Sequence, residues 1–402
     1  MGYAGYGVEV LGAWADVRLK ARDQLMLVDL PFQFRAVTDL AVDTFSATVQ
    51  RQVNRARNKM GSLLYQIVGL ANGWQFGYAS SAMRPIAFAS RNSFFIAHSE
   101  VGMFVAAELL RRGALVGVDF EDWFSEDLLP DARRLRPVGL LRHLERMLLR
   151  QGIHATCPSR AMSQALADEF GCRPPVVVYN AFPWSDRATL KAERVDRRDR
   201  RLPSVHWYSQ TIGYGRGLED LFAALPHLVH PVEVHLRGQP IAGFDVWLAR
   251  QIPPGWHERV FVHGIVSNED LLSRIAEHDI GFAGEMTYSR SRDLTVTNKI
   301  LHYLLGGLAV VASDTRGQRE VADIARAVAG AEPVLLYPSG DPLALASLID
   351  QLLESRERLA QAKAAALVAA ERIFCWERQA PVLIESVRAA LGSDPRNGCR
   401  WA

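Results

Sequence analysis

A glycine-rich stretch near the middle of the chain has the residue types of an anion-binding loop. Gly213, Gly215 and Gly217 follow a strand-like run of Val, Trp and Tyr, and a helical segment begins at Leu218. At such a helix start, unpaired backbone N–H groups and the helix dipole attract anions, and glycine lets the backbone approach closely. Arg216 can add a bidentate charged contact. The stretch fits a phosphate site, and a tight turn with a surface arginine explains it equally well.

A second polar stretch follows a later strand-like run. It contains Glu285 and Asp293, and Asn298 and Lys299 stand at the start of the next helical segment. Ligands of open α/β sheets bind beyond the carboxyl ends of strands, where both stretches would lie, so the two could share one pocket. Lys299 falls in a first helical turn, where the helix dipole disfavours a cation. A bound anion would explain this lysine, and a solvated side chain is the alternative.

His98 and Glu100 are the polar candidates of the first half of the chain. Both follow the strand-like run 93–97, so they could also face a ligand at a sheet edge. A loop pair whose polar groups satisfy one another explains them equally well.

A basic helical segment precedes them. Arg51, Arg55 and Lys59 are four residues apart and share one helix face, and no Asp or Glu occurs between Asp43 and Glu100. This composition favours an acceptor-side surface for a lipid-linked phosphate or an anionic membrane, which would make the protein peripheral on the inner face of the membrane. The alternative is a solvated basic helix that packs by its apolar face.

The elements that would position these residues alternate between strand-like and helical segments, which predicts parallel sheets covered by helices. The predicted strands are 8–11, 24–29, 93–97, 114–119, 153–157 and 176–179 in the first half, and 204–209, 232–236, 260–263, 280–283, 309–313 and 334–337 in the second. The clearest predicted helices are 45–70, 101–111 and 138–151. The sequence therefore predicts two doubly wound α/β domains.

The boundary between the two predicted domains is a charged stretch. Residues 186–203 carry many Arg, Asp and Glu without an apolar period, which predicts a linker between a domain of residues 1–185 and a domain of residues 204–370. Residues 371–391 are helical in pattern, and residues 392–402 form a tail with Pro, Asn and Gly that we expect to fray.

Composition limits the class of protein. The chain has 402 residues with 46 Lys and Arg against 44 Asp and Glu, so nothing global indicates a nucleic-acid partner. The 4 Cys residues include no C-x-x-C pair, which indicates neither a disulfide framework nor a structural metal site. No apolar run is long enough to span a membrane and no secretory signal is evident, so we expect a cytoplasmic protein.

The order of the motifs resembles the nucleotide-binding half of family 4 glycosyltransferases of the GT-B fold. The resemblance rests on GYGRGLE from residue 213, DIG from residue 279 and NKILHYLLGGLAVVASD from residue 298. In the first half, GVDFEDWFSE from residue 117, ATCPSRAMSQALA from residue 155 and PVVVYNAFP from residue 175 are similar to that family's segments. The likeness covers roughly residues 8–390. It implies two Rossmann-like domains that face a central cleft, with 371–391 as a helix that crosses back to the first domain.

The family resemblance implies a glycosyltransferase activity. The chain would move a sugar from a nucleoside diphosphate donor to a glycan or lipid-linked acceptor, with retention, without a metal or other cofactor, in polysaccharide assembly. A non-catalytic, degenerate nucleotide-sugar-binding protein of the same fold is the alternative. A nicotinamide-dependent oxidoreductase is a third hypothesis, and it requires that the glycine-rich loop bind a dinucleotide.

Specific roles follow only from the resemblance. The family's basic pair on the donor diphosphate falls on Gln210 and Arg216, and Lys299 lies near the same phosphates. Two family glutamates fall on His302 and Leu294, so both carboxylates are missing. The neutral amide of Gln210 likewise replaces one cation of the pair.

Other carboxylates could serve in place of the missing ones. Glu285 and Asp293 lie in the same loop and could bind sugar or ribose hydroxyls. The family's active-site histidine in the first domain falls on Glu121, next to Asp122, and these two could orient the acceptor or stabilise positive charge on the sugar. The resemblance also implies that the first strand, loop and helix of the fold are absent before residue 8, through a truncated start or the loss of one wall of the cleft.

Overall fold

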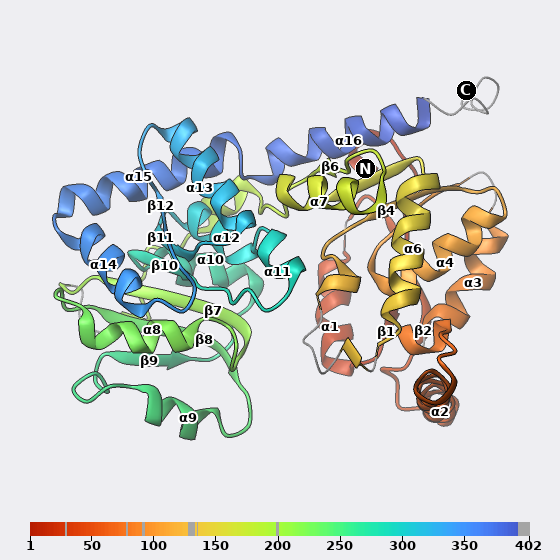
Figure 1. Cartoon of the computed structure of the whole chain (residues 1–402), viewed down its shortest axis with the longest axis horizontal. Helices are drawn as coiled ribbons and strands as arrows, with labels where there is room; N and C mark the ends of the chain where they lie inside the picture. Colours follow the sequence, from red (N-terminus) through yellow and green to blue (C-terminus); the bar gives the residue numbers. More distant parts are fainter. Residues whose placement is uncertain are drawn as a thin grey trace. The chain divides into compact units, whose positions relative to one another are not determined.

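The computed structural model describes residues 1–28, 30–77, 79–90, 93–127, 133–134, 136–197 and 201–392. The chain divides into two compact units (Figure 1). Unit 1 consists of Met1–Cys157, Ser163–Val176 and Leu383–Ala402, and unit 2 of Pro158–Met162 and Val177–Val382. This division differs from the expected one, because residues 177–203 belong to unit 2. The tail beyond Gly392 lies outside the described residues.

Unit 2 is built on a six-stranded parallel sheet of order β12-β11-β10-β7-β8-β9. Its strands are β7 (Ser204–Ile212), β8 (Glu233–Pro240), β9 (Val260–His263), β10 (Ile280–Ala283), β11 (Ala309–Ser313) and β12 (Val334–Tyr337). The predicted bounds of β9 to β12 are confirmed, and β7 and β8 run past their predicted ends. The doubly wound order is confirmed, because the crossovers lead from β7 outward in both directions.

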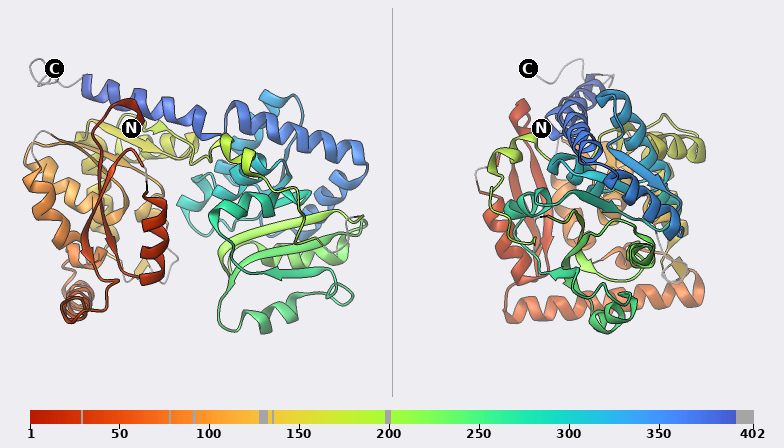
Figure 2. Two further views of the ribbon diagram at one scale, coloured as in Figure 1. Left: turned by 180° about the vertical axis from the view of Figure 1, so that it is seen from behind. Right: turned by 90° about the vertical axis from the view of Figure 1, so that its left-hand side faces the viewer.

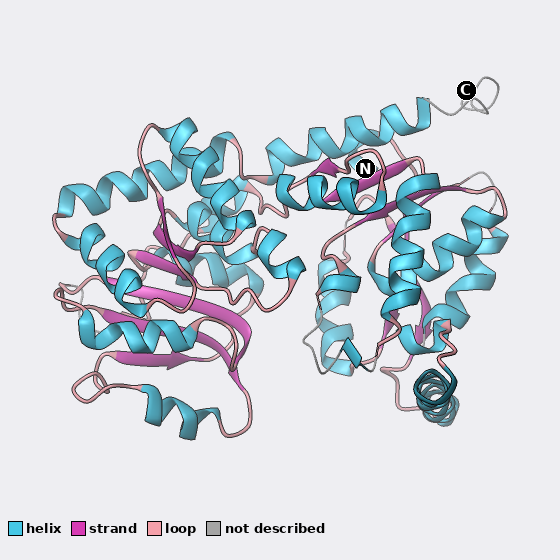
Figure 3. Cartoon of the chain, viewed as in Figure 1, coloured by secondary structure: helices cyan, strands magenta, loops and turns pink. Residues whose placement is uncertain are grey.

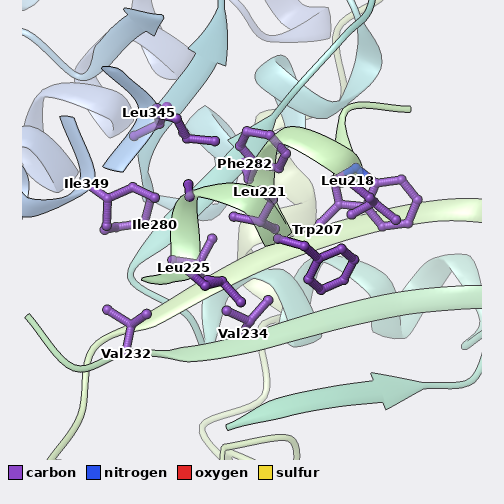
Figure 4. Close-up of a cluster of buried hydrophobic side chains, with 14 of the residues drawn as sticks. Trp207, Leu218, Leu221, Leu225, Val232, Val234, Ile280, Phe282, Leu345 and Ile349 are labelled. Carbon is purple, nitrogen blue, oxygen red and sulfur yellow. The ribbon is translucent and has the colours of Figure 1, made fainter. Parts of the chain in front are cut away.

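Helices cover both faces of this sheet (Figure 3). They are α8 (Leu218–Ala224), η5 (Leu225–His227), α9 (Phe244–Gln251), α10 (Asn268–Ala276), α11 (Arg290–Leu294), α12 (Asn298–Gly306), α13 (Arg316–Ala329), α14 (Pro342–Leu353) and α15 (Arg356–Arg372), with η4 (Trp184–Thr189) before the sheet. Trp207 and Phe282 on one face pack with Leu221 of α8 and Ile349 of α14 (Figure 4). The strands β10 and β11 are buried on both faces, which explains their continuous apolar runs.

The predicted linker is not a free connection within the described residues. Asp196 and Arg197 are 6% and 8% exposed, and Arg197 Nη1 lies 2.9 Å from Asp279 Oδ2. Asp196 accepts a hydrogen bond from Arg237 of β8. Two of the charges that indicated a solvated linker are therefore paired inside unit 2, and residues 198–200 lie outside the described part.

Unit 1 contains two separate parallel sheets. The larger has the order β3-β4-β5-β6, with β3 (Phe94–Ala97), β4 (Leu115–Asp119), β5 (His154–Cys157) and β6 (Val176–Val177). The smaller pairs β1 (Glu9–Trp14) with β2 (Gln33–Asp39), next to α1 (Val17–Met26) (Figure 2). The other elements are η1 (Gly2–Ala4), α2 (Phe45–Val68), η2 (Gly73–Phe76), α3 (Ala79–Ala89), α4 (Ser99–Arg111), η3 (Phe124–Glu126), α6 (Val138–Gln151) and α7 (Arg160–Phe170). Within the described residues, the strands of unit 1 form two sheets, where a single doubly wound sheet was expected.

One predicted strand of unit 1 is also wrong. Residues 24–26 end the helix α1 instead of beginning a strand, and Leu25 and Met26 are 78% and 54% exposed. The strand that pairs with β1 is β2, whose alternation of Phe34, Ala36 and Thr38 went unrecognised. The apolar run has the composition of a buried strand, although its residues 24–28 are largely exposed. The helix predicted at 371–391 is α16 (Trp376–Gly392), which begins in unit 2 and ends in unit 1.

Candidate functional site

The glycine-rich loop of unit 2 lies directly against the loop that follows β10. Gly217 precedes α8 with a φ of +77°, and a Cβ atom on it would lie 2.8 Å from the backbone of Gly284. Only glycine fits this contact, because both the left-handed backbone and the missing side chain are required. The two polar stretches therefore meet at the carboxyl ends of β7 and β10, as the sheet topology predicts.

The polar groups of the glycine-rich loop have partners within the loop region. Arg216 Nη1 donates to Ser209 Oγ at 3.0 Å, and the Gly215 N–H donates to Glu219 Oε1 at 2.8 Å. Gly213 is buried, and Gln210 is exposed. A carboxylate thus accepts a hydrogen bond from one of the N–H groups expected to bind phosphate. Glu219 was not predicted as part of the site, although it lies in the GYGRGLE motif.

Glu285 is the centre of a charge cluster at the same place. Its side chain is buried, Oε1 accepts from Lys299 Nζ at 2.6 Å, and Oε2 lies 3.4 Å from Arg292 Nη1. Its backbone N–H donates to Ser313 Oγ at 2.7 Å. The lysine side chain is only 13% exposed, so the solvated lysine considered from the sequence is wrong. The buried carboxylate of Glu285 is therefore the direct partner of this lysine at the start of α12.

Asp293 and Asn298 bond to other parts of unit 2. Asp293 lies in the short helix α11, within a stretch expected to be a loop, and its carboxylate accepts from the N–H and Nε of Arg316 at 3.1 and 2.6 Å. Asn298 Oδ1 accepts from Asn180 Nδ2 at 3.0 Å. Leu294 is fully buried in the core. The structure therefore places Glu285 and Asp293 in one region but gives each its own cationic partner.

His302 lies inside the unit rather than on its surface. Its ring stacks on Phe182 with the ring centres 3.9 Å apart, and Nδ1 lies 3.0 Å from the hydroxyl of Tyr208. Burial lowers the pKa of His302 to about 4, so the ring is neutral at pH 7. It cannot replace the charge of the family's glutamate, and it contributes one neutral hydrogen-bonding group.

His98 and two carboxylates meet at the ends of β3 and β4 in unit 1. His98 Nδ1 lies 3.1 Å from Asp119 Oδ2 and 3.6 Å from Glu121 Oε1, and Thr156 donates to the other oxygen of Asp119 at 2.5 Å. Hydrogen bonds to Asp119 and then to Glu121 raise the pKa of His98 to about 9, although the side chain is half-exposed. Ser99 follows with a φ of +62°, an unusual backbone for a residue other than glycine. Asp119 was not predicted as a site residue. The one sequence feature that points to it is its position at the end of a predicted strand.

This cluster is also the one group within the described residues whose ligand atoms are spaced closely enough to hold a metal ion. A protonated histidine does not bind a metal, so an ion would have to displace the proton held at Nδ1. The expectation of a site without metal therefore stays a prediction. Glu100 pairs with Arg136 instead of joining the cluster, and Asp122 is partly buried beside it.

The basic helix expected at 45–70 is α2. Arg55 and Lys59 are exposed, whereas Arg51 is partly buried and donates to the carbonyl of Leu40 at 3.1 Å and to Thr48 Oγ1 at 2.9 Å. Arg51 therefore holds the start of the helix in place and is less available to an external anion.

Part of unit 2 matches a known family model. Residues 207–355 match the family model for glycosyl transferases group 1. Unit 2 thus carries a glycosyl transferases group 1 domain. No curated protein sequence matches the chain. The group 1 domain contains both loops of the candidate site and the cluster around Glu285.

Several solved structures share the fold of the whole chain. HepE of Anabaena in complex with UDP is 16% identical with a TM-score of 0.65, and the match covers 96% of this chain and 100% of HepE. A UDP-forming α,α-trehalose-phosphate synthase from Burkholderia vietnamiensis is 12% identical with a TM-score of 0.60, over 97% of this chain and 100% of that chain. Sucrose-phosphate synthase from Thermosynechococcus elongatus is 15% identical with a TM-score of 0.59, over 79% and 78%.

These likenesses confirm the predicted α/β fold class with the GT-B architecture. Together with the group 1 domain they support a glycosyltransferase. Among the described residues, no helix is both long and apolar enough to cross a membrane.

Proposed function

We propose that this chain is a glycosyltransferase of the family 4 type, which moves a sugar from a nucleoside diphosphate donor to a glycan or lipid-linked acceptor with retention. The observation that carries the proposal is the contact of Gly217 with Gly284, which brings two loops of the group 1 domain together at the carboxyl ends of β7 and β10. Arg216 lies on the first loop, and Lys299 reaches Glu285 on the second. HepE and the trehalose-phosphate synthase are named for UDP, so UDP-glucose is the first donor to test.

The proposed chemistry needs stabilisation of a leaving diphosphate. Arg216, Lys299 and the N–H groups of the glycine-rich loop supply positive charge for it, which is usually a large contribution to such catalysis. No metal is required in this scheme. The bond from the sugar to the departing phosphate breaks on the face where the acceptor oxygen bonds, and a phosphate oxygen takes the acceptor proton.

Carboxylates of unit 2 contact the groups that would bind the diphosphate. Glu285 fixes the ammonium of Lys299 at 2.6 Å, and Glu219 holds the Gly215 N–H at 2.8 Å. A diphosphate at the loop would take over part of these contacts because it carries more charge than either carboxylate. In this proposal the donor also contacts the neutral side chains of Gln210, Asn298 and His302. The carboxylate of Asp293 binds its hydroxyl groups.

Unit 1 supplies the acceptor side of the proposed reaction. Glu121 and Asp122 orient the acceptor or stabilise positive charge on the sugar, and Glu121 is held by His98. His98 is cationic at neutral pH because its pKa is raised, so it positions carboxylates instead of removing a proton.

The test measures release of the nucleoside diphosphate from UDP-, GDP- and ADP-glucose without acceptor. Slow hydrolysis of one donor by the wild type is expected, with a roughly hundredfold loss in Arg216→Ala, the size seen when one charge-stabilising donor is removed. Arg250→Ala, which removes an exposed arginine of α9, is the matched control and should keep the wild-type rate. Equal rates for the wild type and Arg216→Ala would refute the assignment.

A further inference from the structure

The helix α2 exposes its apolar side chains. Val49, Val53, Met60, Leu63 and Ile67 are 45%, 41%, 53%, 52% and 70% exposed. Successive members are four, seven, three and four residues apart, so they form one stripe along the helix. Phe45, at the start of the same helix, is 86% exposed. An exposed stripe of this length is unusual, because apolar helix faces normally pack against a core.

The opposite side of α2 is the one that contacts the body of unit 1. Ala47 and Gly61 are the buried residues of this helix, and at about 100° per residue they lie across from the stripe. A Cβ atom on Gly61 would lie 3.2–3.3 Å from Asn72, Gln75 and Trp74, so the absence of a side chain allows the helix to approach η2. The alternative of a helix packed by its apolar face is therefore wrong.

Cationic side chains border the stripe on both sides. Arg55 and Lys59 lie along one edge and Arg57 along the other, and all three are exposed. Within the described part of the chain they form no ion pair. No acidic residue lies between Asp43 and Glu100 to balance them. An open groove of about 580 Å³ runs beside the first half of the stripe, between α2 and α3.

An apolar stripe fits either a second copy of this chain or a lipid surface, and the charges beside it distinguish the two. The spacing would also suit a helix pair between two copies of this chain, as in a coiled coil. In such a pair the cations at the edges would approach one another without acidic partners, which disfavours it. An anionic lipid surface satisfies both features, because headgroups pair with the cations while apolar side chains enter the acyl boundary.

We propose that α2 is a membrane-docking helix that lies in the plane of an anionic bilayer. The stripe from Val49 to Ile67 inserts between lipids, and Arg55, Arg57 and Lys59 contact the headgroups. Ala47 and Gly61 hold the helix to unit 1, so the fold does not have to open. This inference goes beyond the proposed glycosyl transfer and does not depend on it, since lipid binding can be measured without donor or acceptor.

The experiment measures partition of the full chain onto vesicles of phosphatidylcholine alone and of phosphatidylcholine with phosphatidylglycerol. The wild type should bind the anionic vesicles and not the neutral ones. Replacement of Arg55, Arg57 and Lys59 by Gln should weaken partition roughly a hundredfold, at about fivefold for each cation. Replacement of Met60, Leu63 and Ile67 by Gln should also abolish stable binding. All three side chains are exposed, so this variant should keep the fold, which circular dichroism checks.

Two control variants match these changes elsewhere. Arg194, Arg250 and Arg356 are exposed, and their replacement by Gln removes the same charge. Val229, Ile265 and Leu343 are 82%, 62% and 60% exposed, and their replacement by Gln removes similar apolar area. Both controls should bind like the wild type. Equal binding to neutral vesicles, or equal losses in the controls, would overturn the proposal. So would light scattering that shows a wild-type dimer dispersed by the stripe variant, because the stripe would then join two copies.

Discussion

The cations buried in unit 2 and the exposed cations of α2 in unit 1 have different surroundings. In unit 2, Lys299 bonds to Glu285, Arg197 to Asp279 and Arg237 to Asp196, and all of these carboxylates are largely buried. On α2 of unit 1, the exposed cations have no carboxylate nearby in the sequence. In our proposals this difference corresponds to two kinds of partner, a diphosphate that takes over contacts of Lys299 in unit 2 and an extended anionic surface at α2 of unit 1.

Removal of the central carboxylate of unit 2 should have the largest effect. Glu285→Gln leaves Lys299 largely buried without a compensating charge, and a break of this kind costs about 3–5 kcal/mol of the free energy of unfolding. Urea unfolding at pH 7 measures it. The double variant Glu285→Gln/Lys299→Met should recover most of the loss, because no buried charge remains. If Glu285→Gln is as stable as the wild type, the pair is not what holds Lys299.

Acid should act on unit 2 through its buried histidines. The folded pKa of His302 is about 4 against about 6.5 when unfolded, so its contribution to stability is present above pH 6.5 and lost as the pH falls toward 4. Between pH 7 and pH 4.5 this amounts to about 2–3 kcal/mol. The gap in unfolding free energy between wild type and His302→Gln should shrink by that amount. A gap that stays constant with pH would contradict a buried neutral ring.

The contribution of His98 in unit 1 to stability should depend on pH in the opposite direction, and the effect should be smaller. Its folded pKa is about 9, so its stabilising contribution is complete below pH 6.5 and is lost as the pH rises through 9. The ring is half-exposed, so solvent screens the effect on stability, and NMR titration of the ring is the better measurement. Asp119→Asn should lower this pKa more than Glu121→Gln does. The reverse order would show that Glu121 is the main partner.

The sequence predicted unit 2 far better than unit 1. The strands β10 to β12 are short, largely buried apolar runs, so their bounds are plain from composition. In unit 1 the run at 24–29 has the same composition but ends an exposed helix, and β2 is half-buried with a weak alternation. An apolar pattern in the sequence predicts the right element only where the apolar residues are buried in the fold. In unit 1 several apolar residues are exposed, so the pattern was misleading there.

The candidate site was predicted in position but not in its contacts. Glycine spacing and strand order placed Arg216 and the loop around Glu285 at one sheet edge, because topology alone decides that. The pairing of Lys299 with Glu285 depends on the rotation of α12 and on burial, which no spacing reveals. The exposure of the α2 stripe was unpredictable for the same reason, since an amphipathic pattern does not say which face meets the protein.

The central claim is that the two loops of unit 2 bind a nucleoside diphosphate through Arg216. Thermal unfolding of the wild type and of Arg216→Ala, each with UDP, GDP, ADP, CMP or NADH, tests it most directly. Ligand at a hundred times its Kd stabilises the folded state by about 2.7 kcal/mol, which gives a measurable rise in Tm. We predict a rise with one nucleoside diphosphate that is lost in Arg216→Ala. No rise with any diphosphate, or an equal rise in the variant, would contradict the claim.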